Sequence, residues 1–164
     1  QQLILNDIVD SLYSQGIKKL VIMNGHGGND FKPILREVGS KYPGMFICLC
    51  TWYQAVDRNK YFENEGDHAD ELETSVMLHL YPQFVLPLDE AGDGKSKKFS
   101  IDALNQKWAW TERKWSKVSS DTGIGYPGKA TKEKGEKFFN DCVEKVSRFF
   151  IELSETPIDK MYSE

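Results

Sequence analysis

A histidine set between glycines is the feature of this chain with the clearest chemical meaning. It lies in the six residues Asn24-Gly25-His26-Gly27-Gly28-Asn29. This stretch follows the apolar run 20–23, typical of a buried strand, and precedes a helical pattern at 31–38. His26 is therefore expected at the carboxyl end of a strand, where open α/β sheets place their ligands. Glycines at this point leave space beside the imidazole ring.

A second polar cluster combines a histidine with several carboxylates, in the order Asp67-His68-Ala69-Asp70-Glu71-Leu72-Glu73-Thr74-Ser75. Two such clusters at the ends of strands and helices indicate a metal site. The alternative for the second cluster is a solvated acidic first turn, which the helix dipole favours. The alternative for the first is a phosphate loop, which would need a G-x-G-x-x-G or G-x-x-x-x-G-K-[ST] pattern. The turn has neither pattern, so a metal is favoured.

Helical geometry separates the two glutamates of the second cluster. Each residue of a regular helix advances by about 100°. If the helix includes the whole cluster, His68, Glu71 and Ser75 share a narrow stripe, and Glu73 points well away from Glu71. Both glutamates then cannot reach one metal ion, so one of them must have another role.

The elements that would position these residues alternate between helix and buried strand. The hydrophobic pattern predicts helices at 3–15, 30–41, 69–80 and 131–154, strands at 19–23 and 46–52, a short extended piece at 84–88 and a loop at 91–100. This alternation indicates an α/β structure with a mostly parallel sheet. A length of 164 residues allows one domain with its own core.

Composition excludes several classes of function. A net charge of −4 gives no general basic field for nucleic acid, and no apolar run is long enough to span a bilayer. Three cysteines, an odd number, do not form a disulfide framework, so we expect buried thiols in a cytoplasmic protein. Trp108, Trp110 and Trp115 lie in a segment without a clear pattern, where they would line a pocket or a subunit contact.

The two clusters together resemble the creatininase (creatinine amidohydrolase) family. The match covers the glycine turn, the run His68 to Ser75 with Asp70 where the family usually has glycine, and the segment Gly123-Ile124-Gly125-Tyr126-Pro127-Gly128-Lys129-Ala130-Thr131 followed by Glu133-Lys134-Gly135. It extends from the first residues to about Phe150. The resemblance implies a three-layer α/β fold, with a mostly parallel sheet flanked by helices.

The resemblance also implies a chemistry. It implies a metal-dependent amidohydrolase that uses two divalent ions (zinc, manganese or iron) to hydrolyse a C–N bond of a small cyclic amide or formamide. His26 would bind one ion and Glu71 the other. His68 would transfer the proton during catalysis, and Glu73 would support the site without binding an ion itself. The family forms hexamers, so the implied partners are a small-molecule substrate and further copies of the chain, without nucleic acid or membrane.

Three further expectations follow from the comparison with the family. Gly27 and Gly28 replace bulkier, charged residues of creatininase proper, and Asn64 to Gly66 carry no substrate-stacking tryptophan, which argues against creatinine as substrate. The family has a preceding block with a Glu, a His and an Asp that bind metal. We therefore expect this chain to be the C-terminal part of a longer protein and residues 1–164 alone to be inactive.

The alternative from another class is a non-catalytic α/β binding or assembly domain that retains the motifs as relics.

Overall fold

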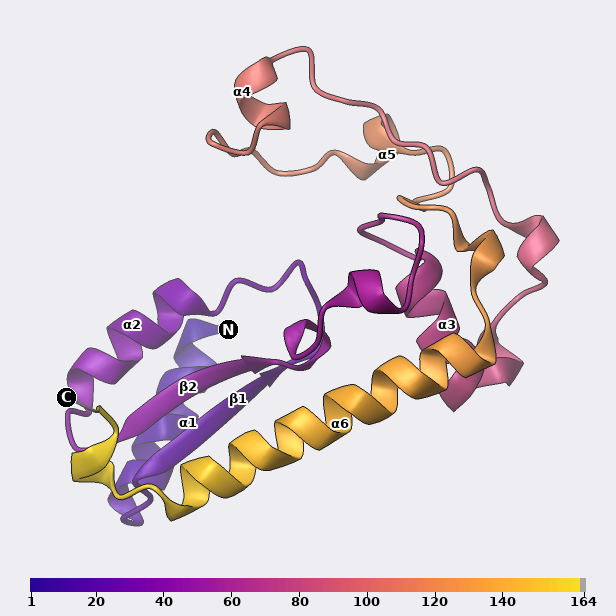
Figure 1. Ribbon diagram of the computed structural model, residues 1–164. Helices are drawn as coiled ribbons and strands as arrows, with labels where there is room; N and C mark the ends of the chain where they lie inside the picture. The colour runs from indigo at the N-terminus through magenta and orange to yellow at the C-terminus, as the bar shows by residue number, and fades with distance from the viewer. Residues whose placement is uncertain (163–164) are drawn as a thin grey trace. The chain divides into compact units, whose positions relative to one another are not determined.

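The computed structural model describes residues 1–162, which form two compact units. The first unit contains Gln1–Ala55 together with the residues from Cys142 on, and the second contains Val56–Asp141. Figure 1 shows the course of the chain through both. Each unit is described separately below.

Two parallel strands form the centre of the first unit. Strand β1 (Lys19–Asn24) pairs with β2 (Phe46–Thr51), with Lys19 opposite Phe46 and Asn24 opposite Thr51. Both strands are rich in apolar and β-branched residues, which fit a pleated, partly buried surface. Because the strands are parallel and in register, their carboxyl ends lie at the same edge. The glycine turn leaves β1 at that edge.

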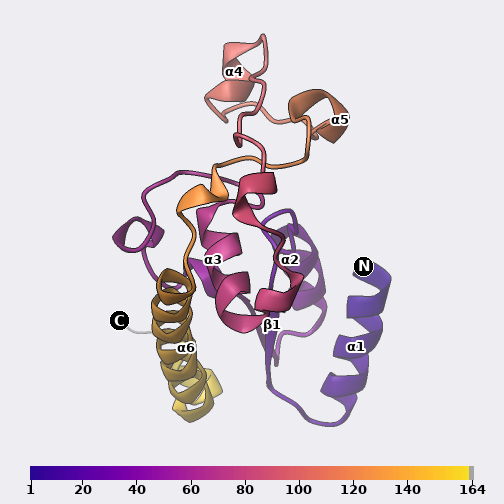
Figure 2. The ribbon, with the colours of Figure 1, turned by 90° about the vertical axis from the view of Figure 1, so that its right-hand side faces the viewer.

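Helices lie on both sides of this strand pair. Helices α1 (Gln2–Ser14) and α2 (Lys32–Lys41) pack on one side, where Val9, Val38 and Met45 are buried against Leu20 and other partly buried residues. Residues 142–155 of helix α6 (Lys132–Glu155) lie on the other side (Figures 1 and 2). The unit thus has the helix–strand–helix layering of an α/β fold.

A lysine fastens the end of α6 to the beginning of β1. The ammonium group of Lys19 donates to the carbonyl oxygens of Leu153 (2.6 Å), Ser154 (3.0 Å) and Thr156 (2.6 Å). The last carbonyls of a helix lack partners within the helix and carry its partial negative charge. Lys19 supplies both the missing donors and the opposite charge.

The second unit is built around helix α3 (Glu71–Leu80), the first residues of α6 and long connections that contain the short helices α4 (Asp102–Asn105) and α5 (Trp115–Val118). Its core includes Phe62 and Phe138, whose ring centroids are 5.2 Å apart. Gly135 of α6 lies directly against the backbone of Ser75 in α3. A Cβ atom at position 135 would lie only 1.9 Å from the Ser75 carbonyl oxygen.

Most of the predicted elements are confirmed, with three corrections. The helix predicted at 69–80 begins at Glu71, and the helix predicted at 30–41 begins at Lys32. The segment 84–88 is not extended throughout, because single 3-10 turns at Pro82–Phe84 and Leu88–Glu90 overlap it at both ends. The strands, the loop at 91–100 and the last helix are as expected. Within residues 1–162, no helix is long and apolar enough to cross a membrane.

A glycine in the second unit, compared with a control glycine in the first, tests the packing of α3 against α6. Gly135→Ala should destabilise the protein by about 3 kcal/mol or more, because the new methyl group overlaps backbone atoms of α3. Gly39→Ala is the matched control, since a Cβ in this α2 position meets no atom within 4 Å. It should stabilise the protein by about 0.5–1 kcal/mol through helix propensity. Urea denaturation of both variants measures the difference, and equal stabilities would contradict the close contact of α3 with α6.

Candidate active site

The glycine turn after β1 is held together by one buried asparagine. The side-chain oxygen of Asn24 accepts hydrogen bonds from the His26 N–H and from the Asn29 side-chain amide, both at 3.2 Å. The Asn29 N–H also donates to the His26 carbonyl oxygen at 3.2 Å. Asn24 is buried whereas His26 is exposed. The turn therefore has a fixed backbone and presents its imidazole to solvent.

The imidazole of His26 is oriented within this turn. The Gly28 N–H donates to its Nδ1 atom at 3.0 Å, so the lone pair of the neutral ring lies on Nδ1. A Cβ atom at position 28 would lie 3.0 Å from Cε1 and 3.1 Å from Nδ1. The absence of a side chain at Gly28 therefore leaves the room that the ring occupies. The hydroxyl of Tyr53 lies beside Gly27, a neighbour that sequence spacing did not indicate.

His68 lies before helix α3 and not in it, which corrects the predicted helical stripe. His68 forms an isolated antiparallel bridge with Ile124, with backbone hydrogen bonds of 2.9 and 3.1 Å. The next residue, Ala69, has a φ of 50°, in the left-handed region that a helix cannot use. Asp70 then caps the helix. The stripe argument holds only for Glu71 and Ser75, which are both buried on one face of α3.

The ring of His68 packs against a tryptophan from a distant segment, with an angle of 55° between the two ring planes. The centroids of His68 and Trp115 are 4.9 Å apart, and the Arg113 guanidinium lies 4.7 Å from the Trp115 centroid. Arg113 also forms an ion pair with Asp67, the neighbour of His68. Asp67, Arg113, Trp115 and His68 thus close a ring of contacts. The sequence contained no signal for this contact, because the two segments are more than 40 residues apart.

The residue in the usual glycine position of the family has a clear structural role. Asp70 is buried and accepts a 2.7 Å hydrogen bond from Arg58, with which it forms an ion pair. Its other oxygen accepts from the Glu73 N–H at 3.0 Å, and Glu73 in turn accepts from the Ala69 N–H at 2.6 Å. This reciprocal arrangement resembles a capping box. Glu73 therefore braces the residue that directly follows His68.

The carboxylate of Glu71 is fully buried, with 0% relative exposure, and engaged by several donors. Its Oε2 accepts from the N–H groups of Glu63 and Asn64 and from the Asn64 side chain, at 2.9 to 3.1 Å. Its Oε1 accepts from the Lys134 ammonium at 2.6 Å. Burial by itself raises the pKa of Glu71, but the hydrogen bonds from Lys134 and Asn64 outweigh it and lower the pKa below its usual value.

These contacts decide how well the predicted ligands suit a divalent ion. Imidazole nitrogen and carboxylate oxygen are donors that zinc, manganese and iron accept. His26 fits, because its ring is exposed. Oε2 of Glu71 already accepts three hydrogen bonds, so Glu71 can bind an ion only through Oε1. The ion would then have to replace the Lys134 ammonium, which donates to Oε1. Within residues 1–162, no group of three or more His, Cys, Asp or Glu side chains is arranged to hold a metal.

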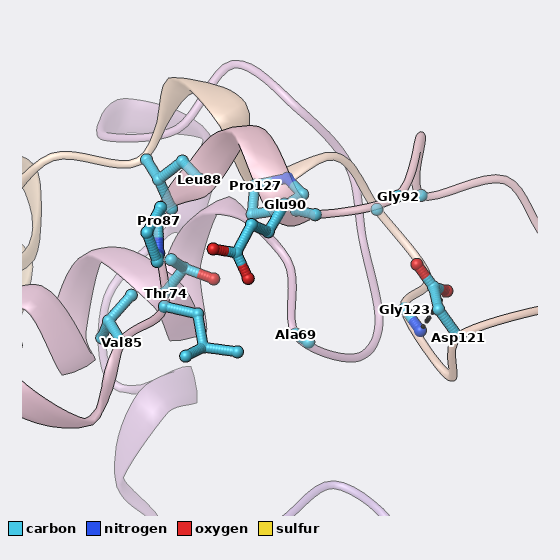
Figure 3. Close-up of a pocket in the computed structure, with 14 residues that line it drawn as sticks. Ala69, Thr74, Val85, Pro87, Leu88, Glu90, Gly92, Asp121, Gly123 and Pro127 are labelled. Atoms are coloured by element: carbon cyan, nitrogen blue, oxygen red, sulfur yellow. Dashed lines mark hydrogen bonds between the residues drawn. The ribbon is translucent and has the colours of Figure 1, made fainter.

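A cavity of about 360 Å³ opens in the second unit beside Ala69 (Figure 3). Its walls are mainly apolar, with Val85, Leu88 and Pro127 among them, and the side chains of Thr74 and Glu90 add polar atoms. Asp121 lies at another part of the wall, where its carboxylate accepts from the Gly123 N–H at 3.0 Å. A cavity of this size and composition can hold a small organic molecule.

Removal of Lys134 should test the buried charge pair. Lys134→Met leaves the Glu71 carboxylate buried without its counter-ion and should cost about 3 kcal/mol or more of unfolding free energy. Lys129→Met is the matched control, because the ion pair of Lys129 with Glu63 is exposed to solvent and should contribute little to stability. Chemical denaturation at neutral pH measures both values, and equal losses would contradict a structural role for the pair.

The Glu71–Lys134 pair also predicts how the stability of the protein changes with pH. The pKa of Glu71 is lowered on folding, so its contribution is present above the unfolded pKa of about 4.3 and is lost as the pH falls through the folded pKa. Hydrogen bonding to Glu71 raises the pKa of Lys134, whose contribution is lost only as the pH rises above about 10.4. Stability curves of the wild type should therefore decline at the acid end more steeply than those of Lys134→Met.

Comparisons with known proteins agree with this geometry. The family model for creatininase, described as creatinine amidohydrolase, matches residues 1–150. A solved structure of a putative creatinine amidohydrolase from Bacteroides fragilis is 48% identical, with a TM-score of 0.89, over 99% of this chain and 63% of that one. A solved creatininase of the Zn–Zn type has the same fold at 23% identity and a TM-score of 0.70, over 95% of this chain and 64% of its own.

Characterised relatives are hydrolases with different substrates. Creatinine amidohydrolase of Pseudomonas putida is 30% identical over 87% of this chain and 58% of its own length. A 3-dehydro-scyllo-inosose hydrolase of Thermotoga maritima is 34% identical over 49% of this chain and 29% of its own. A mycofactocin precursor peptide peptidase of Mycobacterium tuberculosis is 31% identical over 80% of this chain and 49% of its own. The matched part of the chain thus spans between 29% and 58% of the length of these relatives. From the family match, the shared fold and the two motifs, the chain belongs to the creatininase family.

Proposed function

We propose that this chain forms part of a metal-dependent hydrolase that cleaves a C–N bond of a small cyclic amide or formamide. The observation that carries the proposal is the placement of His68. Its backbone is fixed by the bridge to Ile124, its ring packs against Trp115, and the next residue, Ala69, lines the cavity of about 360 Å³. An acid–base group next in the chain to a residue that lines a small cavity is compatible with such a reaction.

His68 would move the proton in this reaction. Hydrolysis adds water to the carbonyl carbon and breaks the C–N bond, and the departing nitrogen must receive a proton. An imidazole exchanges protons close to neutral pH and can take the proton from water and pass it to nitrogen. Trp115 packs against the His68 ring in a tilted arrangement and so restricts its rotation. Glu73 fixes the adjacent backbone through the Ala69 N–H.

His26 and Glu71 would hold the metal ions together with further ligands. Paired divalent ions supply a water of lowered pKa and polarise the carbonyl oxygen. Solved creatininases with this fold include Zn–Zn and Mn forms, which supports divalent ions for this chain as well. The mixed histidine and carboxylate donors suit zinc, manganese or iron.

The cavity supports a small substrate with an apolar part. Its apolar residues would contact a ring or an alkyl group, whereas Thr74, Glu90 and Asp121 offer hydrogen-bond acceptors to N–H groups. Glycines at 27 and 28 and the absence of tryptophan at 64–66 argue against creatinine itself. A tryptophan does reach His68, but from residue 115, so the aromatic contact has a different origin along the chain.

The proton-transfer role predicts a selective loss in the full-length protein. His68→Ala should keep its metal but lose turnover by roughly 10²–10⁴-fold, the usual contribution of a general acid–base group. The assay is amide and formamide hydrolysis with zinc or manganese present, together with elemental analysis of the same preparation. Unchanged turnover with an unchanged pH profile would exclude His68 as the proton carrier.

The ligand assignment is tested by metal content, independently of turnover. His26→Ala should lower the metal content with folding intact, because the side chain is exposed. Glu71→Gln should lower it far more than Glu73→Gln, since Glu73 braces the Ala69 backbone instead. Elemental analysis of the full-length variants gives the numbers, with circular dichroism as the folding control. A larger loss in Glu73→Gln, or full metal content in His26→Ala, would overturn the assignment.

A further inference from the structure

A second cavity, of about 440 Å³, opens in the first unit. Its described lining includes none of the residues assigned above to hydrolysis. Strand β2 contributes its last three residues to the wall, α2 contributes its first residue, and α6 contributes one side of its second half. Open α/β sheets place their ligands at the carboxyl ends of the strands, which is where this cavity lies. Its volume is in the range of small-molecule sites.

Part of the cavity wall is apolar. Leu49 and Cys50 of β2 and Phe149 of α6 line it, and all three residues are partly buried. Burial raises the pKa of the Cys50 thiol, so this group stays protonated at neutral pH. An uncharged thiol packs as a small apolar group. This part of the wall therefore suits a ring or a short alkyl chain.

The charged side chains that line the cavity are both cationic. Lys32 stands at the beginning of α2 and Lys145 in the second half of α6, and the described lining contains no aspartate or glutamate. Two neutral groups that can donate hydrogen bonds, the Thr51 hydroxyl and the Gln54 amide, complete the polar part. The charge and the donors of this part of the wall complement an anion.

Acidic neighbours in the sequence do not neutralise the two lysines. Asp30 accepts a hydrogen bond from the Lys32 backbone N–H at 3.3 Å. Glu144, the residue before Lys145, forms its ion pair with Arg148. Among residues 1–162, neither lysine has an ion-pair partner for its ammonium group. Both charges are therefore available to a ligand.

We propose that this cavity binds a small organic anion, with its carboxylate or phosphate group held by Lys32 and Lys145 and its ring or chain against Phe149. Lysine is a compact charge with rotatable donors, so it binds either kind of anionic group. The neutral wall keeps a second negative charge away from the anion. This binding goes beyond the proposed hydrolysis and needs neither its metal ions nor its acid–base group.

Cys50 reports whether the cavity is occupied, because its thiol lines the wall. The experiment measures the rate at which iodoacetamide alkylates Cys50 in the full-length protein, with tandem mass spectrometry to separate this site from Cys48. The probes are phenylacetate and phenyl phosphate. At about ten times its dissociation constant, a probe that blocks the thiol should slow alkylation about 10-fold. The anion that protects at the lower concentration shows whether the site prefers a carboxylate or a phosphate group.

Three variants test the role of the charges. Lys32→Gln and Lys145→Gln should each raise the probe concentration for half-protection by about 5–10-fold, because each removes a hydrogen bond to a charged group. The matched control is Lys41→Gln, since Lys41 is exposed in the same helix as Lys32 but does not line the cavity. It should behave like the wild type. Both cavity lysines are exposed, so these variants should fold normally, which circular dichroism checks.

The neutral analogue 2-phenylethanol separates charge from apolar contact. It keeps the phenyl ring but carries no charge, so it should protect Cys50 much less than either anion. Equal protection by the alcohol and the anions would overturn the proposal, as would no protection by either anion. Unchanged protection in both glutamine variants, or an equal loss in Lys41→Gln, would also overturn it. The readout is independent of turnover, so a failure of the proposed hydrolysis would leave this result unaffected.

Discussion

Two adjacent carboxylates at the start of α3 are buried inside the protein, and much of the second unit is arranged around them. A buried carboxylate is costly unless hydrogen bonds and an opposite charge compensate for it. Asp70 obtains these from Arg58 and the Glu73 N–H, and Glu71 from Lys134, Glu63 and Asn64. Arg58 also donates to the carbonyl oxygens of Asn64 and Gly66. The two pairs therefore fasten the loop before α3 and the beginning of α6 to the same helix turn.

This arrangement explains how His68 is held without lying on a regular element. The capped helix begins at Glu71, the positive φ of Ala69 turns the chain, and the bridge to Ile124 fixes the backbone of His68. Gly125, which follows Ile124, packs so closely on Gly66 that a Cβ atom would lie 2.6 Å from its Cα. The segment 123–131, which also matches the family, thus supports the backbone around His68. A catalytic role for His68 and a structural role for Asp70 are compatible, because they involve different side chains of the same turn.

The glycine turn of the first unit follows a different principle. Its geometry depends on the buried side-chain amide of Asn24, at the end of β1. The oxygen of this amide accepts hydrogen bonds from the His26 N–H and from the Asn29 side chain. No charge is buried there, so the imidazole of His26 can stay exposed at little energetic cost. An exposed histidine on a fixed backbone is available to a ligand, whereas the second unit uses its charges mainly for its own stability.

The sequence by itself determined the elements and the chemistry of the turns. Hydrophobic periodicity located both strands, α1, α2 and α6 within a few residues, because these elements bury one face each and local spacing reports that directly. The glycine turn and the acidic cluster identified His26, His68, Glu71 and Glu73 as the candidate residues. Only the tertiary structure decided what those residues contact. The left-handed Ala69 displaced His68 from the helix, Lys134 reached Glu71 from 63 positions away, and Trp115 packed against His68. Periodicity contains no information on such contacts, because they depend on how distant segments pack and on which partners a buried charge requires.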